Sequence, residues 1–205
     1  MASKPIASEK TRITPAELRK VASNLFKEKG YHGTSMQDIA DAVGLYKGSL
    51  YHHIPSKEHL LFLVVSSALE QTAQSLASIC ELDVSPLEKL KRAISHHVHY
   101  SVSYQSDLSV LLEDTKHLSP SYRREIVAQQ HRYEQHFGEI LEEGMRLGVF
   151  REMNVRMATF SILGMCNWIY RWYSPAGPMS PDEISDFFFD FVYHALKQDG
   201  CLNPT

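Results

Sequence analysis

The sequence is poor in several features that mark particular classes of protein. Only three cysteines occur among 205 residues, and Cys80, Cys166 and Cys201 lie far apart. This spacing predicts reduced, free thiols rather than a disulfide framework or a thiolate metal site. No uninterrupted apolar run approaches the roughly 20 residues that a membrane helix needs, and the N-terminus has no apolar signal-peptide core. These absences predict a cytoplasmic protein.

Motifs for catalysis are also missing. The chain has no glycine-rich phosphate loop, no nucleophile elbow and no zinc-protease helix motif, so the sequence predicts neither an enzyme nor a bound cofactor. Charge, in contrast, is unevenly distributed. Residues 1–59 hold nine Lys/Arg and six Asp/Glu, whereas residues 60–205 hold twelve and eighteen, within a total net charge of -3. The modest basic excess of the first part favours contact with nucleic acid there.

The best-defined local pattern is TSMQDIADAVGLYKGSLYHHIPSK, residues 34–57. It predicts two short helices joined by a tight turn, the second at 47–53. Ala40 is small where two helices approach, Gly44 lies where a helix end needs a left-handed residue, and Leu50 can reach back to the core. These offsets are typical of a helix-turn-helix, whose second helix enters a DNA major groove. An ordinary helical hairpin is the alternative.

Capping residues followed by proline or an acidic residue predict where the helices begin. We expect the first helix to end at Gly30, and the helix from Ser56 to run to about Cys80. No alternation typical of strands occurs, so the expected fold is all-α. The predicted helix starts are Thr14, Thr34 or Ser35, Ser56, Ser85, Ser119, Asn154 and Ser180. The expected breaks lie near Asp83, Leu118, Gly148 and 175–178.

A wider pattern surrounds the helix-turn-helix. It consists of Leu18, Ala22, Leu25-Phe26, Gly30-Tyr31, Thr34-Ser35, Ile39-Ala40, Val43-Gly44, Lys47-Gly48-Ser49-Leu50-Tyr51, His53 and Ser56-Lys57-Glu58. Over roughly residues 11–60 this pattern resembles the N-terminal domain of TetR/AcrR-type repressors. Ile54 departs from it, since the family usually has an aromatic residue there. Because isoleucine is also apolar, we expect a repacked helix corner and no loss of function.

The resemblance implies a homodimeric, DNA-binding transcriptional regulator that a small hydrophobic ligand releases from a palindromic operator. Its domains would be a flexible N-terminal arm at 1–13, a three-helix DNA-binding domain at 14–58, and a helical ligand-binding and dimerisation domain at 59–205. A repressor is favoured, although the sequence does not decide between repressor and activator. It also does not give the operator.

The residues expected at DNA surround the second helix of the helix-turn-helix. We expect Tyr51 and Lys57 at phosphates, which set position, and Gln37 and Tyr46 at base edges. The set lacks arginine, the commonest reader of guanine. The complete DNA-facing set is Ser35, Gln37, Tyr46, Lys47, Gly48, Ser49, Tyr51, His52 and Lys57.

The most unusual later stretch is MCNWIYRWY, residues 165–173, which holds both tryptophans of the chain. They are four positions apart, so they would share one helical face, and the arginine between them suits a carboxylate or phosphate. With the proline-glycine turn that follows, the stretch is similar to TetR-type regulators of fatty-acid and sterol breakdown, several of which sense acyl-CoA. The expected ligand-binding residues are Tyr100, Tyr104, Tyr133, Phe137, Trp168, Arg171 and Trp172. Alternatively, the tryptophans are core or dimer contacts and Arg171 is a surface charge.

Two further hypotheses concern assembly and metal binding. The apolar stripe of the last helix suits either a core helix or a two-fold interface. The resemblance implies the interface, with Phe160, Phe187, Phe188 and Phe191 as contacts, and a recognition helix that reads only a half-site also requires a dimer. His96, His97 and His99 suggest a metal site, but no acidic residue or cysteine one turn away completes it. Metal sensing is therefore the alternative, and no metal is predicted.

Overall fold

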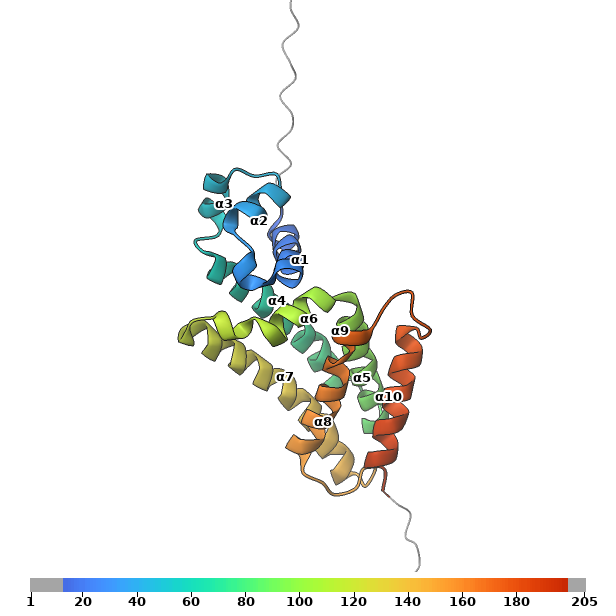
Figure 1. The fold of residues 1–205 in the computed structure, drawn as a ribbon. Coiled ribbons are helices and arrows are strands. Elements are labelled where there is room, and N and C mark those ends of the chain that lie inside the picture. Colours follow the sequence, from blue (N-terminus) through green and yellow to red (C-terminus); the bar gives the residue numbers. More distant parts are fainter. Residues whose placement is uncertain (1–12, 199–205) are drawn as a thin grey trace, which may run out of the picture.

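The computed structural model describes residues 13–198, and its regular elements are helices (Figure 1). The expected arm at 1–13 lies outside the described residues except for Ile13, as does Cys201. Within the described part, the only pairing of strand type is an isolated bridge between Phe150 and Lys197. The helices are α1 (Pro15–Gly33), α2 (Met36–Ala42), α3 (Lys47–His53), α4 (Lys57–Cys80), α5 (Pro86–Ser103), α6 (Gln105–Glu113), a 3-10 turn (Thr115–His117), α7 (Pro120–Arg146), α8 (Val155–Asn167), α9 (Ile169–Trp172) and α10 (Pro181–Leu196).

Capping side chains begin several helices as the sequence predicts, although Ser119 precedes α7 without a capping hydrogen bond. Thr14 caps α1 and exchanges hydrogen bonds with Glu17, and Ser180 does the same with Glu183 at α10. At α2, Ser35 is the cap that the sequence left undecided, and it pairs with Asp38. Thr34 is buried instead, and its Oγ1 donates to the carbonyls of Leu25 and Gly30 at 3.0 and 2.9 Å.

The first helix is interrupted at Gly30 as predicted, but the further turn that follows was not predicted. Gly30 leaves the helical conformation with a φ of +74°, but helical turns resume and end at Gly33. The extra turn brings Tyr31 back onto Phe26, with ring centroids 5.5 Å apart. The glycine therefore marks a kink within the helix.

The long helix α4 joins two apolar cores. Its first half contributes Leu60 and Leu61 to a first core shared with α1, α2, α3 and parts of α6 and α7. Its second half contributes Leu76 to a second core built with α5, α7, α8, α9 and α10. In Figure 1, α1–α3 form a small group at one end, and α4 continues from it into the larger helical body. By length and composition α4 could span a membrane, but half of the qualifying window is buried inside the protein, as in a core helix.

Two helix breaks were not predicted. Tyr104 separates α5 from α6, and Trp168 separates α8 from the single turn of α9. Consequently the two tryptophans do not share one regular helix. Neither break carries a glycine or proline, the residues on which a sequence-based prediction of helix ends depends.

Candidate nucleic-acid interface and effector region

The helix α3 presents one face to the core and the rest to solvent. Leu50 is fully buried, and Ile54 just beyond the helix is 6% exposed. Around these anchors the expected DNA-facing residues are open, with Tyr46 79% and Tyr51 45% exposed. The other members on this helix are exposed Lys47, Gly48 and His52 and the half-buried Ser49. A short helix anchored from behind and open in front has the form that enters a major groove.

The turn before α3 is held by backbone geometry. Gly44 has a φ of +68°, a conformation that L-residues rarely adopt. Its amide donates to the Asp41 carbonyl at 3.1 Å, and the Leu45 amide donates to the Ala40 carbonyl at 2.9 Å. These bonds satisfy the last carbonyls of α2 and turn the chain into α3.

The expected contacts on α2 have local structural partners as well. Ser35 caps the helix, and Gln37 donates from Nε2 to the Asp41 carboxylate at 2.7 Å, while both side chains remain exposed. The Lys29 ammonium lies 2.6 Å from the Asp38 carboxylate and ties α1 to α2. The hydrogen bond from Lys29, followed by those from Ser35, holds the pKa of Asp38 well below its usual range.

Lys57 differs from the exposed Ser35 and Gln37 because it is half-buried and bonded to residues far from it in the chain. Its Nζ donates to the carbonyls of Tyr31 and Thr34, each at 2.7 Å. It also lies 4.3 Å from the centroid of the Tyr31 ring, and burial lowers the pKa of this lysine. Two of its three N–H groups are therefore used to hold α4 against the end of α1.

Histidine contacts link the two parts of the chain near this lysine. Tyr31 stacks on His117, with centroids 5.2 Å apart and ring planes at 12°. A hydrogen bond of 3.1 Å joins Nε2 of His32 to Nδ1 of His117. Burial, followed by the neighbouring His32, lowers the pKa of His117. The last turn of α1 therefore contacts the 3-10 turn directly.

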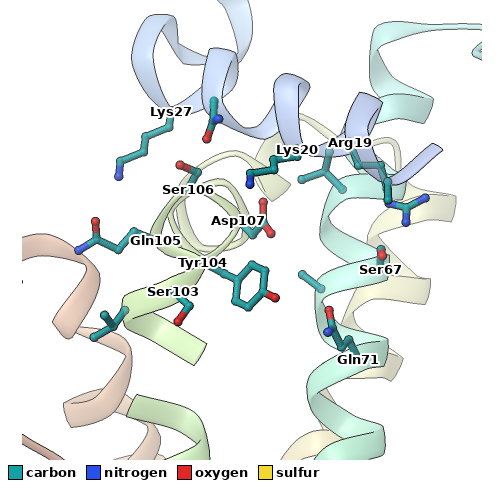
Figure 2. Close-up of a pocket in the computed structure, with 15 residues that line it drawn as sticks. Arg19, Lys20, Lys27, Ser67, Gln71, Ser103, Tyr104, Gln105, Ser106 and Asp107 are labelled. Carbon is teal, nitrogen blue, oxygen red and sulfur yellow. The ribbon is translucent and has the colours of Figure 1, made fainter. Parts of the chain in front are cut away.

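A cavity of about 490 Å³ lies between α1, α4 and the α5–α6 turn, and we call it the junction cavity (Figure 2). Arg19, Lys20 and Lys27 line it from α1, and Asp107 is the one acidic residue in its lining. Figure 2 shows the Tyr104 ring extending across the cavity toward α4. Only Tyr104 of this group was predicted from the sequence, because the lining residues of α1 and α4 are distant from it in the chain and its near neighbours carry no local binding motif.

Two expected ligand-binding residues, Tyr133 and Phe137, are buried in the second core. The Tyr133 hydroxyl donates to Nδ1 of His97 at 2.6 Å, and Nε2 of His97 donates to Oδ1 of Asn167 at 2.9 Å. Complete burial lowers the pKa of His97 to about 4. Both of its ring nitrogens are therefore occupied, and His97 has no free nitrogen for a metal.

Two other expected ligand-binding residues, Tyr100 and Tyr104, stack beside the junction cavity. The rings of Tyr100 and Tyr104 are 4.9 Å apart and nearly parallel. Tyr104 is 43% exposed, whereas the Tyr100 hydroxyl is buried without a hydrogen-bond partner in the described part of the chain. Burial and then the nearby Asp107 raise the pKa of Tyr100.

The remaining three lie on the surface. Trp168 and Trp172 are 60% and 47% exposed, and Arg171 pairs with the Glu113 carboxylate of α6 at 2.9 Å. The Tyr170 hydroxyl donates to the same carboxylate at 2.9 Å. The seven expected ligand-binding residues thus occupy a buried core, the junction cavity and an exposed surface, and the structure does not gather them into one pocket.

The expected dimer contacts are mostly exposed. On α10, Phe187 and Phe191 are 62% and 60% exposed, and on α8 Phe160 is 39% exposed. Phe188 packs partly against the second core instead. A groove of about 530 Å³ runs between α8 and α10, and it is lined by Phe191, Met157 and other apolar residues.

The structure also brings together three potential metal ligands that the sequence did not predict as a group. Cys80 at the end of α4 lies beside His136 and Glu139 of α7, with their potential ligand atoms within 4.8 Å of one another. The separation of 56 positions between Cys80 and His136 hides this proximity in the sequence. Burial, together with nearby carboxylates, raises the pKa of Cys80 to about 11, so the thiol is protonated at neutral pH.

Comparison with known families accounts for both parts of the chain. Residues 18–64 match the family model of bacterial regulatory proteins of the tetR family. Residues 83–196 match the model of the tetracyclin repressor-like C-terminal domain, more than half of the chain. The chain belongs to the TetR family. The expected all-α fold, with an N-terminal helix-turn-helix and a helical C-terminal domain, is thereby confirmed, and the protein is a DNA-binding transcriptional regulator.

Similar TetR-family proteins extend over nearly the whole chain. The transcriptional repressor KstR2 of Mycolicibacterium smegmatis is 30% identical over 192 residues, covering 89% of this chain and 90% of the relative. KstR2 of Mycobacterium tuberculosis (strain H37Rv) is 28% identical over 193 residues, covering 90% and 93%. These relatives are transcriptional regulators.

Solved structures agree with this assignment. The TetR-family regulator PfmR from Thermus thermophilus aligns with a TM-score of 0.81 and 36% identity, covering 86% of this chain and 97% of that protein. AibR, solved in complex with isovaleryl coenzyme A and operator DNA, aligns with a TM-score of 0.80 and 28% identity, covering 87% and 97%.

Proposed function

We propose that this TetR-family protein is a homodimeric repressor that leaves a palindromic operator when an acyl-CoA thioester binds. The observation that carries the proposal is the anchored, open α3, in a chain that aligns over most of its length with AibR bound to isovaleryl coenzyme A and operator DNA. The similarity to KstR2, named a transcriptional repressor, favours repression over activation.

Contacts with DNA come from the exposed side of the helix-turn-helix. Two copies of α3 enter successive major grooves, which sets the spacing of the half-sites. Lys47 and Tyr51 contact phosphates, and Tyr46 contacts base edges. Because Gln37 is already bound to Asp41, it must exchange this partner for a base. A regulator of this kind acts where the DNA is, so we infer a cytoplasmic location.

Dimerisation brings the two helix-turn-helix units together. Phe187 and Phe191 lie four residues apart on α10 and are exposed, and Phe160 on α8 is also exposed, in a groove between α7 and α8. Contiguous exposed apolar surface marks an interface. We place the two-fold contact on α8 and α10, with the groove between these helices filled by the partner.

The effector contacts the region where α9 meets α6. Arg171 and Tyr170 both hold Glu113 of α6, and Gln105 at the start of α6 donates to the Tyr173 carbonyl at 3.0 Å. A thioester that engages Arg171 and the exposed tryptophans therefore acts on α6, which in turn packs against α1. A coupling of about 1–3 kcal/mol, or roughly 5–150-fold in DNA affinity, is typical of such regulation.

Fluorescence anisotropy on labelled DNA from upstream of the protein's own gene tests the proposal. We expect tight, salt-sensitive binding that isovaleryl-CoA or a longer acyl-CoA reverses and the matching free acid does not. A Tyr46→Ala variant should lose operator affinity and still bind the thioester by calorimetry. Tight DNA binding that no acyl-CoA alters would refute the proposal that an acyl-CoA is the effector. Absence of DNA binding at low salt would show that this upstream DNA does not contain the operator.

A further inference from the structure

The junction cavity carries a charge that its surroundings do not neutralise. Arg19, Lys20 and Lys27 all line it from one side of α1, and Asp107 is the single acidic residue opposite them. None of the three cations forms an ion pair with a residue in the described range 13–198. With Asp107 ionised, three positive charges and one negative charge leave the lining at +2, which attracts an anion.

The cavity also has the size and the neutral groups of a ligand site. Its volume of about 490 Å³ lies within the usual range for small-molecule pockets. Ser67 and Gln71 of α4 and Ser103 and Gln105 at the α5–α6 turn surround it with hydrogen-bonding side chains (Figure 2). These groups can bind phosphate oxygens and ring nitrogens that the cations do not reach.

An aromatic surface completes the site. The ring of Tyr104 lies in the cavity, 43% exposed, and is supported from behind by its stack with Tyr100. Such a ring can stack with a nucleobase. The buried Tyr100 hydroxyl, which has no partner in the described residues, lies close enough to Asp107 for that carboxylate to raise its pKa. Tyr100 is not itself among the lining residues, so its contribution to the site is to support the Tyr104 ring.

We infer that the junction cavity binds a phosphate-bearing ligand, the nucleotide end of the acyl-CoA effector, which then bridges the helix-turn-helix to the ligand-binding helices. This inference rests on the proposed function. The phosphates pair with Lys20, Lys27 and Arg19, and the adenine stacks on Tyr104. Because α1 forms one wall and α4 and α6 form the others, an occupant favours one setting of α1 over the alternatives. Ligand binding thereby changes the spacing of the two recognition helices.

Calorimetry with parts of the effector tests this inference. The probes are adenosine 3′-phosphate 5′-diphosphate, isovaleryl-CoA and isovaleryl-pantetheine, which lacks the nucleotide. The variant is Lys20→Gln/Lys27→Gln, and the matched control is Lys116→Gln, which removes the same type of charge from the exposed 3-10 turn outside the cavity.

We expect one nucleotide per chain, bound at least tenfold more weakly by the double variant, because the variant removes two charge-assisted hydrogen bonds to the phosphates. The affinity of the double variant for isovaleryl-CoA should fall by a similar factor, whereas isovaleryl-pantetheine should bind wild type and double variant equally well. The control should stay within about twofold, and operator affinity of the double variant without ligand should change by less than about threefold.

The outcomes separate the inference from the proposed function. Release of wild type and double variant by the same concentration of isovaleryl-CoA would overturn the inference and leave the proposed function intact. Loss of operator binding with unchanged nucleotide binding would also overturn it, because the lysines would then be DNA contacts. If no acyl-CoA releases the operator but the cavity still binds the free nucleotide through these lysines, the proposed function fails, and the phosphate site is supported with a free nucleotide as its source.

Discussion

Two lysines that the sequence assigns to phosphate contact have different environments. Lys57 is half-buried, and its ammonium donates to two carbonyls that end α1. Lys47 at the start of α3 is exposed, and it forms no ion pair within the described residues. Lys57 holds the start of α4 against the end of α1, and Lys47 is free to contact DNA.

Lys57→Met should therefore lower the free energy of unfolding by about 1–3 kcal/mol, because it removes two charged hydrogen bonds and leaves their carbonyls unpaired. Lys47→Met should leave stability within about 0.5 kcal/mol. It should instead reduce the slope of log affinity against log salt by about one unit for each phosphate that the variant no longer binds. Urea unfolding and a salt series on labelled operator measure the two effects. The opposite assignment of effects to the two lysines would contradict this account.

His97 provides a pH-dependent test of the second core. Its pKa falls to about 4 in the folded protein, while an unfolded histidine has a pKa of about 6.5. Above that value the residue is neutral in both states. As the pH falls from about 6.5 toward 4, the unfolded chain binds the proton and the folded chain resists it, so stability decreases by up to about 3 kcal/mol.

Urea unfolding at pH 7 and pH 5, for wild type and His97→Gln, isolates this contribution. The variant removes the titrating group. Subtracting its loss of stability from that of wild type cancels the contributions of His96 and His117, whose pKa values are also lowered. We expect wild type to lose more stability than the variant over this interval. Equal losses in both proteins would show that His97 is not the group responsible.

At the scale of the elements, two glycines beside α3 perform different tasks. Gly44 has a φ of +68° with open space around it, so a side chain there meets backbone strain alone. Gly48 lies within α3, also in open space and exposed. Gly44→Ala should destabilise the protein by about 1–2 kcal/mol. Gly48→Ala should be neutral or stabilise it by up to about 1 kcal/mol, yet weaken operator binding because the new methyl group obstructs the DNA.

Thermal unfolding and operator titration of the two variants measure these opposite patterns. Each variant serves as the control for the other, because both add the same methyl group within a few residues of the recognition helix. If Gly48→Ala bound operator as tightly as wild type, α3 would not approach DNA as closely as we propose.

The helix starts with a capping box were predictable because the signal is local. Thr14, Ser35 and Ser180 each pair with an acidic residue three positions later, and this spacing is visible in the sequence alone. The breaks at Tyr104 and Trp168 were not predictable, since no glycine or proline marks them and tertiary packing decides them. The exposed face of α3 followed from the same short-range pattern that placed Leu50 inward.

The effector region depended on long-range proximity and was only partly predicted. Tyr104 was selected as an aromatic residue, but the cations that surround it come from α1, more than 70 residues earlier in the chain. Similarly, no local signal shows that Arg171 would meet Glu113 of α6. A single sequence carries helical periodicity and turns, but not which helices face one another.

For the whole molecule, the two-fold contact decides whether an operator can be read. Replacing Phe187 and Phe191 by glutamate places four charges in the proposed dimer interface and should weaken dimerisation about 100-fold or more. Because both side chains are exposed in the single chain, its fold should persist. Val127→Glu on α7, which changes an exposed apolar residue on another helix, is the matched control.

Sedimentation equilibrium at micromolar concentration checks this prediction. Wild type and the control should have twice the 23.4 kDa mass of the chain, and the double variant should approach the mass of one chain. The double variant should also lose operator affinity, because each chain then binds a half-site alone. A dimeric double variant would place the interface on a different surface.

The central claim is that the acyl-CoA effector and the operator weaken each other's binding to this protein. Measuring this thermodynamic linkage tests the claim most directly. We would titrate isovaleryl-CoA by calorimetry into the free protein and into protein saturated with operator. Coupling is reciprocal, so the account predicts that operator weakens thioester binding by the same factor, roughly 5–150-fold, by which the thioester weakens operator binding. Equal thioester affinity with and without bound operator would contradict it.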